Sequence, residues 1–154
     1  KRSRRAGFPN IQCKSWNGGS LGNRVGTFDG VLVDAPCTCS GTWRRNPGAR
    51  WRMSPDEIAE LADLQLGILG RAAGAVRPGG VLVYATCSIF REENAGVVES
   101  FLDAAPGFAP EPFAHPLTGE QVDGTVQVWP WEADCDAMFV ARMRRRSALR
   151  TEES

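Results

Sequence analysis

Residues 31–37 read VLVDAPC and residues 81–87 read VLVYATC. Each stretch is a short apolar run that ends in a cysteine, and the segment between Cys37 and Cys87 has room for one loop and one helix. That length is typical of a β-α-β crossover, in which the two strands run parallel. Neighbouring strands lie roughly 5 Å apart, so both thiols are expected at one carboxyl edge of the sheet, where open α/β sheets bind ligands.

The crossover contains a clear signal for a helix. Residues 54–57, SPDE, combine an N-cap serine, a proline in the first turn and a glutamate that closes a capping box. Apolar residues then recur at helical spacing as far as Val76, and residues 77–80, RPGG, stop the helix before the second strand. The segment 36–53 has no apolar period and is expected to be a long loop.

The rest of the chain completes an α/β pattern. Its expected elements are a strand over residues 11–16, a helix that Glu92 and Glu93 open by helix-end electrostatics, and an antiparallel pair over residues 126–131 and 137–143. Residues 31–35 begin with three consecutive apolar residues, VLV, which indicates a strand covered on both faces. The order predicts one half of a doubly wound sheet, without a glycine-rich loop between a strand and a helix.

Composition sets the broad class. The chain has 154 residues, 42% of them apolar, and no run long enough for a bilayer, which favours one soluble domain. Its 18 basic and 18 acidic residues cancel, so an argument for nucleic acid must be local. Five cysteines form no regular framework, which favours reduced thiols in the cytoplasm. The chain begins at Lys1, and we interpret it as a piece of a longer protein.

Several motifs carry a resemblance to a known family. They are DAPC at 34–37, TWRRNP at 42–47, LVYATCS at 82–88, EEN at 92–94 and DAMFVA at 136–141. With them the chain resembles the Sun/NOP2 family of RNA cytosine-5 methyltransferases. The resemblance implies a Rossmann-like, S-adenosylmethionine-dependent methyltransferase sheet that acts on ribosomal or transfer RNA. It also implies a cytoplasmic enzyme, monomeric when complete, with no membrane or DNA partner.

The resemblance implies a role for each thiol. Carbon 5 of cytosine becomes nucleophilic only after a thiolate adds to carbon 6, a task that suits a cysteine with a lowered pKa. By resemblance Cys87 is this nucleophile, and Cys37 helps to remove the carbon-5 proton and release the product. Asp34 would hydrogen-bond the protonated ring nitrogen as the thiolate adds.

The resemblance also bears on the cofactor and on the domain limits. Asp34, Pro36 and Asn17 are implied cofactor contacts, although the family commonly has an aspartate at the last position. The family's glycine-rich cofactor loop would lie before Lys1. We therefore expect residues 1–143 to be a partial catalytic domain that lacks its N-terminal half, and residues 144–154 to be a disordered tail.

Residues 43–52, WRRNPGARWR, form a local basic and aromatic segment. Arginine pairs with phosphate and tryptophan stacks on unpaired bases, so Arg44, Arg45, Arg50 and Trp51 are expected to bind RNA. The alternative is a solvated loop whose tryptophans cover the sheet edge, and one tryptophan is expected to pack inward.

Plainer interpretations remain for the other groups. Cys37 and Cys87 can be buried small hydrophobes, and Cys37, Cys39 and Cys87 offer three sulfurs to a metal. The paired knuckles usual in zinc sites are missing, and the single histidine, His115, lies in a proline-rich connection, so no metal is expected. Arg142 and residues 144–146 are expected to be a solvated chain end. A non-catalytic RNA-binding or scaffold fragment is the alternative function, and a thiol or metal protein is a third.

Overall fold

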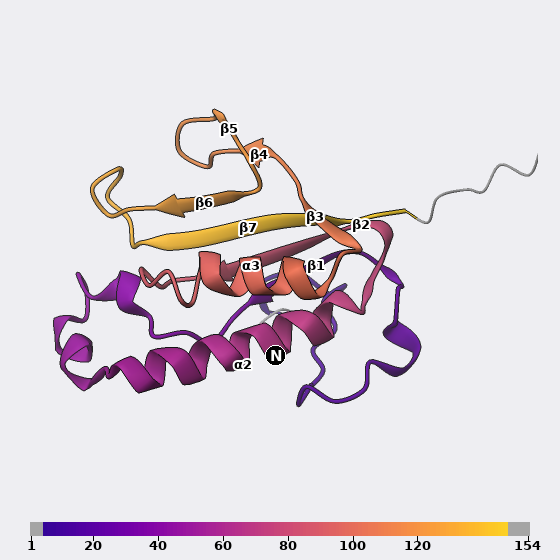
Figure 1. Ribbon diagram of the computed structural model, residues 1–154, viewed down its shortest axis with the longest axis horizontal. Coiled ribbons are helices and arrows are strands. Elements are labelled where there is room, and N and C mark those ends of the chain that lie inside the picture. The colour runs from indigo at the N-terminus through magenta and orange to yellow at the C-terminus, as the bar shows by residue number, and fades with distance from the viewer. Residues whose placement is uncertain (1–4, 148–154) are drawn as a thin grey trace, which may run out of the picture.

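The computed structural model describes residues 5–147 of the chain (Figure 1). Its helices are α2 (Pro55–Ala73) and α3 (Ala95–Ala104), with 3-10 turns at Gly22–Arg24, Ser40–Thr42 and Pro47–Arg52. Its strands are β1 (Phe28–Asp34), β2 (Val76–Thr86), β3 (Phe108–Pro110), β4 (Phe113–Ala114), β5 (Gln121–Val122), β6 (Thr125–Val128) and β7 (Met138–Arg145).

The main sheet has the order β1-β2-β7-β3, and β6 also pairs with β7. β1 and β2 are parallel neighbours, with Val33 opposite Tyr84 and Asp34 opposite Ala85. β7 runs antiparallel to β2, β3 and β6. The predicted β-α-β crossover and the predicted antiparallel finish are therefore both confirmed.

One hydrophobic core joins the two helices to the sheet. α2 and α3 pack against each other and against the same face of the sheet (Figure 1). Leu69 of α2 and Phe101 of α3 meet Leu82, Tyr84 and Met143 there, all of them buried. Burial of each such side chain stabilises the fold by roughly 1.5–3 kcal/mol. The helices are therefore held firmly on the sheet, and the sheet holds β1 and β2 side by side.

The start of α2 follows the sequence signal, but its end does not. The Ser54 hydroxyl accepts the Glu57 N–H at 3.2 Å, and the Glu57 carboxylate accepts the Ser54 N–H at 2.9 Å. The helix ends at Ala73, before the expected last residue Val76. Val76 is instead the first residue of β2, where its side chain is fully buried. The expected stop signal lies inside β2 as an irregularity, where Gly79 adopts a φ of +75° that glycine tolerates.

Two other expectations near the sheet were wrong, and a third is confirmed. Residues 11–16, all described, form no strand, and Trp16 instead donates its Nε1–H to the Gly19 carbonyl at 3.0 Å. β1 is an edge strand with helices on one face, so Leu32 remains 67% exposed although Val33 is buried. The expected loop over 36–53 is confirmed, with two short 3-10 turns within it.

The C-terminal region is more ordered than expected. β3 lies within the proline-rich connection and pairs with β7. The sequence of β3 shows no alternation of apolar and polar residues that would predict a strand. β7 itself continues to Arg145, two residues into the expected tail, while residues 148–154 lie outside the described part. Among the described helices, none has the length and apolarity needed to cross a bilayer.

Candidate active site

The two strand-end thiols meet at the carboxyl edge of β1 and β2. The Sγ atoms of Cys37 and Cys87 are 3.5 Å apart, so either thiol can donate a hydrogen bond to the other. The parallel ladder continues one residue past the end of β1, since the Ala35 N–H donates to the Ala85 carbonyl of β2 at 3.0 Å. The prediction that both cysteines share one sheet edge is confirmed.

The acidity of the thiols differs from the expectation. Burial raises the pKa of Cys87 above its ordinary value, and contact with Cys37 raises it further. Burial also raises the pKa of Cys37. The lowered pKa expected for a resting nucleophile is thus wrong for this structure, because both thiols are half-buried and burial disfavours the thiolate.

A buried carboxylate holds the loops that carry both cysteines. Glu93 is fully buried, and its Oε1 accepts the backbone N–H of Thr38 and the Nε2–H of Gln65, each at 2.9 Å. Its Oε2 accepts the Thr38 hydroxyl at 2.6 Å and the Ser88 hydroxyl. The four donors occupy the acceptor sites that the two carboxylate oxygens offer. Since Thr38 follows Cys37 and Ser88 follows Cys87, one side chain fixes both loops.

The same network reaches into α2 and β2. Gln65 also donates to the Pro36 carbonyl at 2.9 Å and accepts the Tyr84 hydroxyl at 3.0 Å. Tyr84 is fully buried, and burial together with the Glu93 charge raises its pKa. Helix-end electrostatics, the expected role of Glu93, is therefore wrong. The sequence signal was available, because Gln65 is a polar residue at an apolar position of the α2 pattern.

Close backbone packing holds the Cys87 loop from the other side. Gly41 donates its N–H to the Cys87 carbonyl at 2.8 Å, and its own carbonyl accepts the Ala137 N–H at 3.1 Å. A Cβ on Gly41 would lie 2.8 Å from the Cys87 oxygen and even closer to the Ala137 oxygen. Only glycine therefore allows this loop to approach the ends of β2 and β7.

The expected cofactor residues separate in space. Asp34 is exposed and lines a cavity of about 420 Å³ at the free edge of β1, together with Trp16, Leu21 and Leu32. Asn17 and Pro36 are absent from its lining; Asn17 instead accepts the Gly19 N–H at 3.2 Å. An aromatic ring, an apolar wall and one carboxylate suit a nucleoside with hydroxyl groups. The cavity thus fits part of the expected cofactor through Asp34.

A second hollow, of about 520 Å³, lies between the loop after β1 and the start of α2. Cys37 and Thr38 line it with Met53 and with α2 residues that include Leu61 and Leu64. Its mostly apolar wall and its position beside a thiol offer room for a flat ring.

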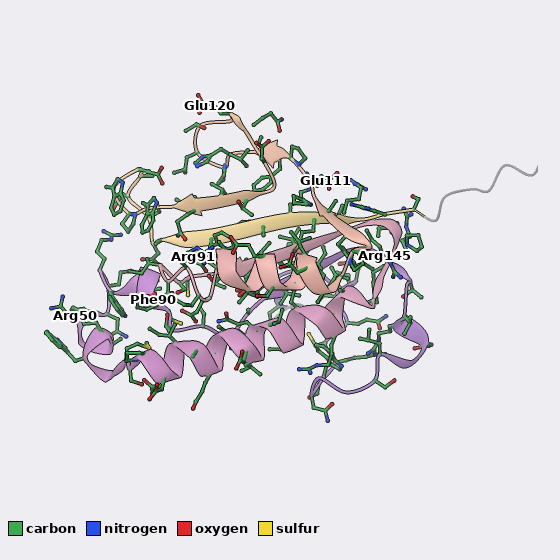
Figure 2. All side chains as sticks on the ribbon, viewed as in Figure 1. Arg50, Phe90, Arg91, Glu111, Glu120 and Arg145 are labelled. Carbon is green, nitrogen blue, oxygen red and sulfur yellow. The ribbon has the colours of Figure 1, made fainter. Side chains whose placement is uncertain are left out.

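The arginine-rich loop is partly neutralised. Arg44 pairs with Asp134 at 2.9 Å, and Arg45 pairs with Asp136, whose pKa it lowers. Arg50 has no acidic partner among the described residues; its guanidinium lies 4.3 Å from the ring centroid of Trp51, which is 78% exposed. Figure 2 shows Arg50 pointing away from the ribbon at the end of the molecule where Phe90 lies.

Trp43 is the tryptophan that packs inward, as expected. Its ring meets Phe90 edge-on, with centroids 6.0 Å apart, and its Nε1–H finds no acceptor among the described residues. Phe90 follows Cys87 by three residues, so Trp43 anchors the arginine-rich loop to the cysteine loop.

The remaining expectations have mixed outcomes. Arg142 and Arg144 are not simply solvated, because both pair with Glu111. His115 Nδ1 accepts two backbone N–H groups of its own turn, in keeping with a structural role at the surface. Cys39, Cys37 and Cys87 place their sulfurs within 4.8 Å of one another.

Comparison with known proteins gives consistent matches. The family described as 16S rRNA methyltransferase RsmB/F matches residues 1–144. Ribosomal RNA small subunit methyltransferase B of Thermus thermophilus is 44% identical over 115 residues, which cover 75% of this chain and 29% of the relative. Methyltransferase F of the same subunit from Escherichia coli is 37% identical over 152 residues, covering 94% and 32% respectively. The chain thus spans less than a third of these curated relatives.

A solved structure agrees with the fold. NSun6 from Pyrococcus horikoshii, crystallised with SFG, superposes with a TM-score of 0.76 at 27% identity. The match covers 95% of this chain and 37% of that one. The family match over residues 1–144 includes both cysteine-bearing strand ends.

Proposed function

The chain belongs to the RsmB/F family of 16S rRNA methyltransferases, and from this premise we propose that it is the catalytic part of an enzyme that methylates carbon 5 of cytosine in RNA. The observation that carries the proposal is the 3.5 Å distance between the Sγ atoms of Cys37 and Cys87. Carbons 5 and 6 of the ring are bonded to each other, so two thiols at this separation reach both reacting atoms.

The two thiols divide the work as the family resemblance implies. The Cys87 thiol first loses its proton to the solvent, its Sγ then forms a bond to carbon 6, and the electron pair of the ring double bond moves to carbon 5. S-adenosylmethionine would supply the electrophilic methyl group that this carbon takes up, and the remaining thioether would leave. Cys37 then accepts the carbon-5 proton, the double bond forms again, and Cys87 leaves as a thiolate.

Asp34 connects the base to the cofactor. As Cys87 adds, positive charge builds on the protonated ring nitrogen, and a carboxylate at the end of β1 stabilises it. Asp34 also lines the cavity with Trp16 that would receive part of the cofactor. SFG, the molecule in the NSun6 structure, is an analogue of S-adenosylmethionine, which supports this choice of cofactor.

RNA would approach at the same end of the sheet. Arg50 and Trp51 offer a cation and an aromatic face with no acidic partner among residues 5–147, whereas Arg44 and Arg45 are engaged by acids. The target base has to leave its stack to reach Cys87. Both curated relatives are named for ribosomal RNA, which favours ribosomal over transfer RNA as the substrate.

The test uses the complete enzyme and a denaturing gel. Cys37→Ala is expected to trap a covalent RNA adduct, because carbon 5 keeps its proton and Cys87 cannot leave. Cys87→Ala is expected to abolish both the adduct and methyl transfer. An adduct that survives Cys87→Ala would overturn the assignment. Absence of both methyl transfer and adduct in the enzyme with both cysteines intact, with RNA binding retained, would favour the non-catalytic RNA-binding alternative.

A further inference from the structure

A third thiol lies beside the proposed catalytic pair. The sulfurs of Cys37, Cys39 and Cys87 all lie within 4.8 Å of one another, from two different strand-end loops. We propose that these three cysteines form a binding site for one soft divalent cation of the zinc class. The proposed methyl-transfer chemistry uses only two of the thiols, so it does not account for Cys39.

The sulfur spacing matches a tetrahedral thiolate site. With metal–sulfur bonds of about 2.3 Å, the sulfurs at two corners of a tetrahedron are about 3.8 Å apart. The Cys37–Cys87 pair is already at 3.5 Å, and the third sulfur lies within 4.8 Å of both. Small side-chain rotations therefore complete three corners, and the fourth is left for water.

The backbone at Cys39 supports a specific placement of its thiol. Cys39 has a φ of +54°, and no other non-glycine residue in the described range has a positive φ. A side chain in this left-handed conformation is unfavourable by roughly 1–2 kcal/mol relative to the ordinary one. The unusual backbone turns the Cys39 thiol back toward its neighbour, since it donates to the Cys37 carbonyl at 3.5 Å.

The other two ligands are held rigidly, and the ion has an entry path. Thr38 binds Glu93 directly after Cys37, and the Cys87 carbonyl accepts the Gly41 N–H. Cys39 is exposed, so a hydrated cation reaches the cluster from solvent. Rigid ligands with one accessible member lose little entropy when they close around an ion.

Ligand chemistry selects the class of metal. Thiolates prefer zinc, cadmium and copper(I) to the oxygen-seeking magnesium and calcium. Binding forms three sulfur–metal bonds, and the three thiol protons pass to the solvent, so no oxidant or reductant is needed.

The consequence of binding rests on the proposed function. A metal-bound Cys87 has its lone pair engaged and cannot attack a base, so the ion would switch methyl transfer off. Metal binding itself needs neither RNA nor cofactor. Failure of one proposal is therefore distinguishable from failure of the other.

The experiment titrates cadmium chloride into the reduced 154-residue chain and records the ultraviolet cadmium–thiolate charge-transfer band, with a competing chelator to exclude weak binding. Saturation at one cadmium per chain is expected, and zinc chloride added beforehand should occupy the same site and raise the cadmium concentration needed to produce the band. Absence of the band would contradict the proposed site. So would a band that appears only at high protein concentration, with one cadmium shared between two chains.

Variants assign the ligands. Cys39→Ser removes one sulfur conservatively and should weaken cadmium binding by about a hundredfold. Cys39→Gly, which suits the left-handed backbone, should do the same without loosening the loop. Cys13→Ser is the matched control, because Cys13 is exposed and outside the cluster. Unchanged affinity in both Cys39 variants, or lost affinity in the control, contradicts the proposal.

Discussion

The Glu93 side chain accepts two hydrogen bonds from Thr38, one from the backbone N–H at 2.9 Å and one from the hydroxyl at 2.6 Å. Thr38 directly follows Cys37, and Glu93 also accepts the hydroxyl of Ser88, which directly follows Cys87. Separation of the two thiols is therefore controlled by a carboxylate that touches neither sulfur.

Replacement of this carboxylate should loosen both loops. Glu93→Gln keeps one oxygen for the N–H groups of Thr38 and Gln65, but its NH2 group cannot accept the hydrogen bonds that the second oxygen receives from two hydroxyls. We expect a loss of about 1–3 kcal/mol in the free energy of unfolding, measured by urea denaturation. Glu92→Gln is the control, since Glu92 is exposed and its change should stay within about 0.5 kcal/mol. Equal effects at both positions would contradict the network.

A methyl group at Gly41 should push the Cys87 loop away from the sheet. Gly41→Ala brings a Cβ against the carbonyl oxygens of Cys87 and Ala137, and such overpacking destabilises by about 1–3 kcal/mol. A bifunctional thiol reagent should also bridge Cys37 and Cys87 less efficiently. Gly48→Ala, where the added Cβ meets nothing within 4 Å, should leave both measurements unchanged. A tolerated alanine at Gly41 would show that the close approach is not maintained.

Glycine at Cys39 should stabilise the metal-free protein. The φ of +54° is unfavourable for cysteine and ordinary for glycine, so Cys39→Gly is expected to raise the free energy of unfolding by up to about 1 kcal/mol. Urea denaturation in the presence of a chelator measures the change. Cys13→Gly, at a residue with ordinary φ, should instead be neutral or slightly destabilising. A destabilised Cys39→Gly would mean that the thiol contributes more than its backbone costs.

The thiol pair should react slowly at neutral pH and faster in alkali. The thiolate is the reactive form, and burial raises the pKa of Cys87 above the value of about 8.5 typical of free cysteine. Alkylation of Cys87 by iodoacetamide, followed by mass spectrometry in a chelator, should therefore still accelerate between pH 8 and about pH 10. The exposed Cys13 serves as an internal reference for reagent access. A rate at Cys87 that levels off below pH 8 would indicate a resting thiolate.

RNA binding should depend more on Arg50 than on Arg45. Arg50 has no acidic partner in the described part of the chain, while Arg45 is held by Asp136. In the complete enzyme, Arg50→Ala should weaken binding of single-stranded RNA. The slope of the logarithm of the binding constant against the logarithm of the salt concentration should also fall by the equivalent of about one phosphate contact. Trp51→Ala should weaken it by roughly tenfold through lost stacking.

Arg77→Ala provides the matched control for these two variants. Arg77 is also exposed and pairs with Asp29 at the opposite end of the sheet. Equal losses of RNA affinity in Arg77→Ala and Arg50→Ala would exclude the arginine-rich loop as the contact surface.

Local patterns determined much of this protein. The apolar runs of residues 31–37 and 81–87, the capping box at Ser54 and the crossover length together predicted parallel neighbours and two thiols at one edge. These signals succeed because each depends on residues close in sequence or on a fixed chain length. The strand predicted over residues 11–16 failed because alternation alone supplies no partner for its backbone hydrogen bonds.

Tertiary structure decided what surrounds the thiols. The sequence could not show that Glu93 and Gln65 turn inward, since their hydrogen-bond partners lie up to 55 positions away. Nor could it show that burial raises the pKa of Cys87, or that acids after β6 engage Arg44 and Arg45. The sequence named the reactive atoms, but their acidity, spacing and access depend on long-range burial and charge, which exist only once the chain has folded.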